Sequence, residues 1–219
     1  MSQLAVLGGS KEAAHPFPSW PIWDDVDRQA ILDVLESGKW WMCAYGEAEL
    51  GSDKRAASRR SQVEQFEEEL AAYHHVKRAV AVASGSAALE ICMRAIELAP
   101  GDEVITTPYT FFATSQCILS SGALPVYVDI DPETYNLDPT QIEAAVTERT
   151  RAILPVHFSG ELADVDAIAE IADRHRLRVI EDAAQSPGAS LRGGRFVGSF
   201  GDAAIVSFQA SKCLNSGEG

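Results

Sequence analysis

The sequence predicts an α/β fold with a mostly parallel, doubly wound sheet and flanking helices. Six short runs rich in apolar and β-branched residues are each followed by a helical or turn segment, and they begin near residues 80, 103, 125, 152, 178 and 203. Strands that alternate with helices in this way are typical of parallel sheets covered on both faces. The 219 residues suffice for one large α/β domain or two small ones.

The first sixty residues are expected to form a lead that precedes this domain. A helix from about Asp24 to Ser37 has one apolar face, and Gly38 fits its end. Residues 46–60 lack apolar periodicity and are expected to form a mobile loop. We therefore place the lead at residues 1–60 and the main domain at residues 61–219.

Caps and periodicity predict four helices in the main domain. Ser61 and Glu64 have the spacing of a capping box, and Asp138 followed by Pro139 supplies an N-cap and a proline in the first turn. Two further helices have apolar residues at helical spacing. These are Leu89, Cys92, Met93 and Ile96 in the first, and Val165, Ile168, Ala169 and Ala172 in the second.

Composition excludes some classes of partner. The net charge of −14 argues against binding to nucleic acid or to an anionic membrane. The four cysteines form no C-x-x-C pair, and the sequence has neither a signal peptide nor 18 consecutive apolar residues. A cytoplasmic location is therefore expected. Backbone N–H groups can still bind a phosphate locally.

Polar residues gather at the ends of the predicted strands. In a parallel sheet these carboxyl ends share one edge, where ligands bind. The convergence predicts a binding site at that edge without naming its ligand. The residues concerned are Ser84 to Ser86, Tyr109 to Thr114, His157, Asp182, Gln185 and Ser207.

Two segments suit a flat, phosphorylated ligand, although each also has an ordinary interpretation. Ser84-Gly85-Ser86-Ala87 opens a helix, so it either binds a phosphate through backbone N–H groups or simply forms an N-cap. Phe111 either stacks on a planar ring or belongs to the core. The sequence has no G-x-G-x-x-G and no Walker A lysine, which disfavours dinucleotides and nucleoside triphosphates.

Asp182 and Lys212 are the charged candidates. A carboxylate at a strand end is often a loop cap, and a lone lysine is usually solvated. Together, however, an aspartate that pairs with a pyridinium nitrogen and a lysine that forms a Schiff base are the groups that pyridoxal phosphate most needs from a protein. Partial desolvation after an apolar strand would make the amine of Lys212 a usable nucleophile and base.

Five ordered segments are more specific than any single residue. They are SGSAAL at 84–89, PGDEVITTPYTFFAT at 100–114, PVYVDIDPETYNLDP at 125–139, EDAAQSPGA at 181–189 and SFQASK at 207–212. In this order and spacing they resemble the DegT/DnrJ/EryC1/StrS family of sugar aminotransferases, a branch of the fold-type I pyridoxal-phosphate enzymes. The resemblance extends from about residue 16 to the last residue.

The resemblance implies a role for each site residue and no metal. Lys212 would hold the cofactor covalently and shuttle a proton, and Asp182 would pair with the pyridinium nitrogen. Gln185 would contact the ring hydroxyl, and Phe111 would stack on the ring. The phosphate would be held by Ser86, Ala87 and Ser207.

The implied reaction is amino transfer from glutamate or glutamine to a keto-sugar or keto-cyclitol. FPSWPIWDD at 17–25 and GKWW at 38–41 are similar to the branch that serves antibiotic biosynthesis. Relatives that act as sugar 3-dehydratases have histidine in place of Lys212, so the lysine favours amino transfer. The alternatives are a lyase similar to 3-amino-5-hydroxybenzoate synthase and a non-catalytic, cofactor-binding subunit of a complete homologue.

Family members continue through a further strand and a smaller C-terminal domain. The resemblance therefore implies a truncated chain from which that domain is absent. Its expected partners are a second copy, in a homodimer of the complete protein, or a separate chain that supplies the missing half.

Overall fold

The computed structural model describes residues 3–10, 19–38, 61–191 and 194–218. The chain divides into two compact units, Met1–Trp41 and Met42–Gly219. The predicted loop at 46–60 lies outside the described residues, and so does the end of the predicted lead at residue 60. That boundary therefore stays a prediction.

The first unit contains a short 3-10 helix, η1 (Ala5–Leu7), and the helix α1 (Asp25–Ser37). Asp24 caps α1, because its carboxylate accepts hydrogen bonds from the N–H groups of Val26 at 2.7 Å and Asp27 at 3.3 Å. Gly38 ends the helix with a left-handed φ of 65°, a conformation that glycine adopts without steric cost. Both predicted ends of this helix are confirmed.

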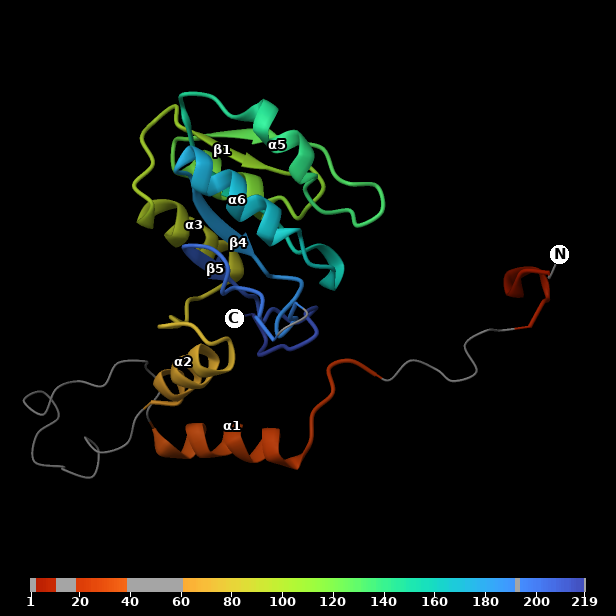
Figure 1. Ribbon diagram of the computed structural model, residues 1–219. Helices are drawn as coiled ribbons and strands as arrows, with labels where there is room; N and C mark the ends of the chain where they lie inside the picture. Colours follow the sequence, from red (N-terminus) through yellow and green to blue (C-terminus); the bar gives the residue numbers. More distant parts are fainter. Residues whose placement is uncertain (1–2, 11–18, 39–60, 192–193, 219) are drawn as a thin grey trace, which may run out of the picture. The chain divides into compact units, whose positions relative to one another are not determined.

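The second unit is built on a five-stranded parallel sheet with the strand order β2-β1-β3-β4-β5 (Figure 1). The strands are β1 (Glu103–Thr106), β2 (Leu124–Tyr127), β3 (Thr150–Leu154), β4 (Arg178–Asp182) and β5 (Ala203–Ile205). Because all five strands run in the same direction, their carboxyl ends share one edge. The predicted fold class is confirmed.

Helices cover both faces of the sheet. The helices α3 (Gly85–Ala95) and α4 (Ala113–Ser120) pack on one face, and α5 (Pro139–Ala145) and α6 (Val165–His175) pack on the other (Figure 1). The remaining elements are α2 (Gln62–Tyr73) and the 3-10 turn η2 (Phe158–Gly160). No helix in the described part of the chain is both long and apolar enough to cross a membrane.

The core alternates along each strand as a two-sided sheet requires. In β1, Val104 packs with α3 and α4, whereas Ile105 packs with α5 and α6. In β3, Ala152 and Leu154 face the first pair of helices, and Ile153 faces the second. Strand residues alternate between faces, so a parallel strand between two helical layers is apolar throughout.

Local hydrogen bonds confirm the predicted caps. The Ser61 hydroxyl accepts from the Glu64 N–H at 3.1 Å, and the Glu64 carboxylate accepts from the Ser61 N–H at 2.8 Å. Asp138 accepts from the N–H of Thr140 at 2.9 Å, with Pro139 in the first turn of α5.

One predicted strand is wrong. The run near residue 80 forms no strand among the described residues. A strand is stabilised by a neighbour that completes its ladder, and no strand in the described part of the chain pairs with this run. The N–H of Ala81 instead donates to the side-chain carboxylate of Glu67 at 2.7 Å.

We expect Ile153→Ala to destabilise the sheet by about 2–5 kcal/mol, because it leaves a cavity in the central strand. Ile153 is fully buried and lies opposite Ile105 and Val179 in the neighbouring strands. Urea unfolding measures the effect. Ile91→Ala is the matched control, since Ile91 on α3 is 52% exposed and its truncation should change stability by less than about 0.5 kcal/mol. Equal effects of the two changes would contradict the core assignment.

Candidate active site

Asp182 ends β4 and is 4% exposed. One carboxylate oxygen, Oδ2, accepts a hydrogen bond from the Thr114 hydroxyl at 2.8 Å. The other, Oδ1, accepts from the N–H of Ala184 at 3.1 Å. Thr114 lies on α4 and is itself in hydrogen-bond contact with the Thr110 hydroxyl at 3.0 Å. The carboxylate is therefore held in a fixed orientation at the carboxyl edge of the sheet.

Burial raises the pKa of Asp182, because desolvation disfavours the charged form. The hydrogen bonds from Thr114 and Ala184 and the positive charge of Lys212 lower the pKa without cancelling the effect of burial. A cation placed against this carboxylate would favour its ionised form. The site therefore favours a positively charged partner such as a protonated ring nitrogen.

The segment that carries Lys212 follows β5 as a series of tight turns. The N–H of Lys212 donates to the Gln209 carbonyl at 2.8 Å, and the Gln209 side chain accepts from the N–H of Ser211 at 2.8 Å. Phe208 packs edge-on against Phe66 of α2, with ring centroids 5.1 Å apart. Lys212 is half-buried, and its charge acts on Asp182. Lys212 therefore lies close enough to Asp182 for its charge to favour the ionised carboxylate.

The amino end of α3 meets Ser207. Ser207 is 5% exposed, and a Cβ added to Gly85 would lie 3.2 Å from the Ser207 Cβ, which is tighter than most Cβ contacts in proteins. Glycine at this position lets the helix end approach the strand end. The Ser84 hydroxyl accepts from the Ala87 N–H at 3.2 Å, so the N-cap interpretation is correct and that N–H is already engaged. Ser86 and the remaining first-turn N–H groups are the candidate anion donors.

Phe111 lies between β1 and α4 and is 58% exposed. Its ring contacts only one other ring among the described residues, that of Phe112, with centroids 4.3 Å apart. The alternative that Phe111 belongs to the core is therefore wrong. An exposed ring at the binding edge has a face available for stacking.

Gln185 follows β4 by three residues. Its side-chain oxygen accepts from the N–H of Ser159 at 3.0 Å. That bond fixes the orientation of the amide and leaves its NH₂ group to donate to another oxygen.

The sequence analysis named His157 among the polar residues at the strand ends but missed Glu181, its buried partner. Both side chains are fully buried, with 3.1 Å between His157 Nε2 and Glu181 Oε2. His157 Nδ1 accepts from the Ala163 N–H at 3.2 Å, so Nε2 carries the proton and donates to Glu181. The available signal was a second carboxylate directly before Asp182, after the apolar residues Val179 and Ile180.

Glu181 also binds three backbone N–H groups of the loop that leads into β5. They belong to Gly198 at 2.8 Å, Phe200 at 2.7 Å and Gly201 at 2.8 Å. Burial opposes the ionisation of Glu181, but the bonds from His157, Gly201 and Gly198 outweigh it and lower the pKa. The carboxylate is an internal brace between β3, β4 and this loop.

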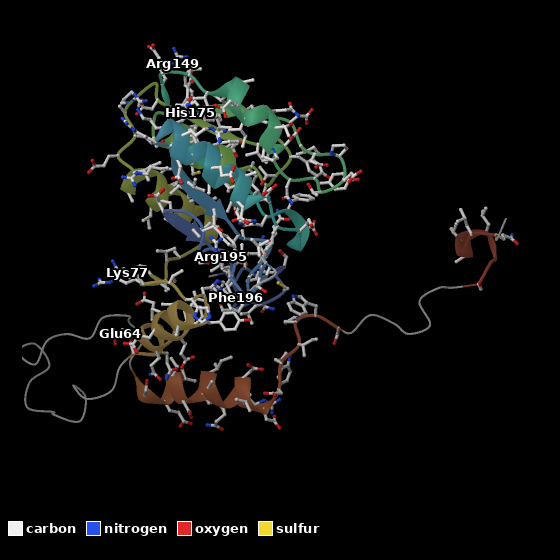
Figure 2. The ribbon with its side chains drawn as sticks, in the orientation of Figure 1. Glu64, Lys77, Arg149, His175, Arg195 and Phe196 are labelled. Atoms are coloured by element: carbon white, nitrogen blue, oxygen red, sulfur yellow. The ribbon has the colours of Figure 1, made fainter. Side chains whose placement is uncertain are left out.

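Aromatic contacts anchor the same loop to α2. Phe196 packs against Tyr73, with ring centroids 4.9 Å apart, and against His74 at 5.9 Å. His74 Nδ1 lies 2.7 Å from the carbonyl oxygen of Val197. Figure 2 shows Phe196 beside α2, with Arg195 next to it. Arg149, whose guanidinium pairs with Glu103 at the opposite, amino end of β1, lies far from this loop (Figure 2).

Residues 49–219 match the model of the DegT/DnrJ/EryC1/StrS aminotransferase family. The chain belongs to this family. It is 42% identical over 219 residues to the L-glutamine:scyllo-inosose aminotransferase of Streptomyces griseus, a match that covers all of this chain and 49% of that protein. The chain spans about half the length of the curated relatives it matches.

Solved structures agree with the family assignment. The crystal structure of 3-amino-5-hydroxybenzoic acid synthase superposes with a TM-score of 0.80 and 40% identity, over 93% of this chain and 49% of the synthase. NtdA from Bacillus subtilis, solved with its bound cofactor PMP, has a TM-score of 0.74 and 36% identity, over 89% of this chain and 41% of NtdA. The predicted fold-type I architecture is confirmed.

We expect Glu181→Gln to destabilise the protein by about 1–3 kcal/mol at neutral pH. The amide oxygen can replace only one carboxylate oxygen, so the NH₂ group would face two buried donors. A lowered pKa means that the stabilisation is present above the ordinary value of 4.5 and is lost as the pH falls through the folded value.

Thermal melts between pH 3 and pH 7 test this expectation. Wild-type stability should fall more steeply with acid than that of the variant. Glu170→Gln on α6 is the control. Because Glu170 is exposed, its substitution should leave the fall of the melting temperature with acid unchanged. If the melting temperatures of wild type and Glu181→Gln fall equally between pH 7 and pH 3, the claim that ionised Glu181 stabilises the fold is wrong.

Proposed function

We propose that this protein is a pyridoxal-phosphate-dependent aminotransferase that moves an amino group from glutamate or glutamine to a keto-sugar or keto-cyclitol. The observation that carries the proposal is the buried, oriented carboxylate of Asp182 with the charge of Lys212 acting on it. Family membership and the name of the Streptomyces griseus relative support the reaction class.

The residues at the edge of the sheet fit this cofactor. Burial raises the pKa of the Asp182 carboxyl group, so its ionised form would gain from contact with a protonated pyridine nitrogen. The exposed face of Phe111 suits an aromatic ring, and the NH₂ group of Gln185 suits a phenolic oxygen. The start of α3 and the adjoining Ser207 would hold the phosphate, with Ser86 as a donor in the first turn of the helix.

When bound, pyridoxal phosphate supplies an electron sink that stabilises negative charge developing on the amino-acid carbon. The amine of Lys212 would carry the cofactor covalently and, once released, act as the base that moves a proton from that carbon. Asp182 would keep the ring nitrogen protonated through its ionised carboxylate. The hydrogen bonds from Thr114 and Ala184 hold that carboxylate in a fixed orientation.

Partners and location are further parts of the proposal. A keto-sugar or keto-cyclitol and an amino-acid donor are the proposed substrates. We also propose that the complete protein is a cytoplasmic homodimer, or that a partner chain supplies a second half. The half-length match to the relatives motivates this part of the proposal.

The likeness to 3-amino-5-hydroxybenzoic acid synthase favours a second candidate. In that case the same lysine would remove a proton from a hydroxylated amino-cyclohexenone precursor, which would lose a hydroxyl group as water and so become aromatic. Product analysis separates the two reactions, because only the lyase yields an aromatic product.

We expect borohydride reduction of the cofactor-loaded protein to attach the cofactor to Lys212. Peptide mass spectrometry locates the adduct. Lys212→Arg keeps a positive charge beside Asp182 but has no amine that can form a Schiff base, so it should carry no adduct and lose about 10²–10⁴-fold or more of any amino-transfer rate. Lys77→Ala, which removes a lysine outside the site (Figure 2), should be labelled like the wild type. Labelling at another lysine would exclude the proposed anchor.

We expect Asp182→Asn to raise the melting temperature of the cofactor-free protein at pH 7. The pKa of Asp182 is raised, so its stabilising contribution is complete below the ordinary value of 3.8 and is lost as the pH rises through the folded value. Asparagine can accept from Ala184 and donate to the Thr114 hydroxyl, which can then donate to Thr110.

With cofactor the order should reverse, because only the carboxylate gains from a pyridinium partner. Thermal melts with and without pyridoxal phosphate measure both effects. A variant that gains as much stability from the cofactor as the wild type would remove Asp182 from its assigned role.

A further inference from the structure

A pocket of about 480 Å³ opens at the carboxyl edge of the sheet, beyond the residues assigned to the cofactor. Three aromatic rings line it, with Tyr109 in the middle. The ring centroid of Tyr109 is 4.7 Å from that of Phe158 and 5.9 Å from that of Tyr135. Tyr109 is 47% exposed and Tyr135 is 50% exposed, so their rings present open surface to a ligand.

The walls of the pocket are held by one buried side chain. Asn136 is 2% exposed, its amide donates to the Glu161 carbonyl at 3.1 Å, and its oxygen accepts from the Phe158 N–H at 2.9 Å. It thereby ties the loop after β2 to the turn after β3. Tyr135 and Ser159 line these walls with left-handed φ values of 60° and 52°, a strained backbone that fixes where their side chains point.

The pocket adjoins the proposed cofactor site through two connections. Tyr109 lies two residues before Phe111 on the segment between β1 and α4. Ser159, a lining residue, donates its N–H to Gln185 at 3.0 Å. A ligand in the pocket would therefore reach toward the same ring that Phe111 and Gln185 would contact.

The lining combines aromatic faces with carboxylates. Glu133 and Glu161 contribute the carboxylates, and none of the described residues that line the pocket is basic. Aromatic faces pack against the C–H faces of a saturated ring, and carboxylates accept hydrogen bonds from hydroxyl groups. A diphosphate would meet two negative charges in this lining, and the described lining residues offer it no cation. The volume is ample for a six-membered ring with its hydroxyl groups.

We propose that this pocket is the acceptor subsite and that it selects a free, uncharged polyhydroxylated ring over a nucleotide-linked sugar. The inference rests on the proposed amino transfer and names the substrate class for it. Tyr135 supplies the packing face and Glu161 a hydroxyl acceptor, so both are specificity-determining residues.

The test uses the full chain loaded with pyridoxal phosphate and two probes that cannot react. Scyllo-inositol represents the free polyol, and UDP-glucose represents the nucleotide-linked sugar. Ligand-observed NMR titrations give the dissociation constants for wild type, Tyr135→Ala, Glu161→Gln and the control Tyr127→Ala. Tyr127 is also 50% exposed but lies outside the pocket lining.

We expect scyllo-inositol to bind more tightly than UDP-glucose. Tyr135→Ala should weaken its binding about tenfold and Glu161→Gln about threefold to tenfold, with no change in Tyr127→Ala. Absence of scyllo-inositol binding to the wild type, equal binding by all four proteins, or preferential binding of UDP-glucose would each overturn the proposal. A change in sedimentation of Tyr135→Ala, without loss of scyllo-inositol binding, would identify the pocket as a protein interface instead.

The borohydride adduct at Lys212 is measured on the same samples. A normal adduct with no scyllo-inositol binding would refute the subsite alone. A missing adduct with pocket-dependent scyllo-inositol binding would refute the proposed cofactor chemistry and leave the subsite standing.

Discussion

Two carboxylates occupy consecutive positions at the end of β4, and both have to be stabilised where water does not reach. Successive strand residues point to opposite faces, so each side chain needs its own set of donors. Glu181 receives four hydrogen bonds from the protein and has a lowered pKa. Asp182 receives two and has a raised pKa. Glu181 is therefore fully stabilised by the protein itself, whereas the ionised form of Asp182 would be stabilised further by a cationic ligand.

The other parts of the site take their positions from this pair. The loop bound by Glu181 leads directly into β5. Ser207 lies two residues beyond the last residue of this strand, and Lys212 lies seven residues beyond it. His157 connects Glu181 to the end of β3, and Thr114 connects Asp182 to α4. Hydrogen bonds and strand pairing with β4 thus fix four neighbouring segments, which are the loop before β5, β5 itself, the end of β3 and α4. Buried polar groups that satisfy one another in this way specify a single arrangement more strictly than apolar packing does.

The binding edge has two ends with opposite electrostatic character. The start of α3, against Ser207, offers N–H groups and the positive end of a helix dipole, which suits a phosphate. The pocket around Tyr109 offers carboxylates and aromatic faces, which suit hydroxyl groups on a saturated ring. Asp182 and Lys212 belong to the strand and loop that form the rest of this edge. Such a division would let one site hold an anionic cofactor and a neutral acceptor without competition between them.

The sequence by itself determined the alternation of strands and helices and the caps at Ser61 and Asp138, because periodicity and capping are local properties. It also named Asp182 and Lys212 as a pair through motif spacing, and their shared role in the site is a proposal. It failed near residue 80, since a strand exists only with a hydrogen-bonded neighbour, and pairing is not encoded in one run of residues. Only the tertiary structure decided that Phe111 is exposed and that the Ala87 N–H donates to the Ser84 hydroxyl. It also showed that Glu181 is buried and bound to the loop before β5. Burial and donor geometry arise from segments far apart in the chain, so no local pattern carries them.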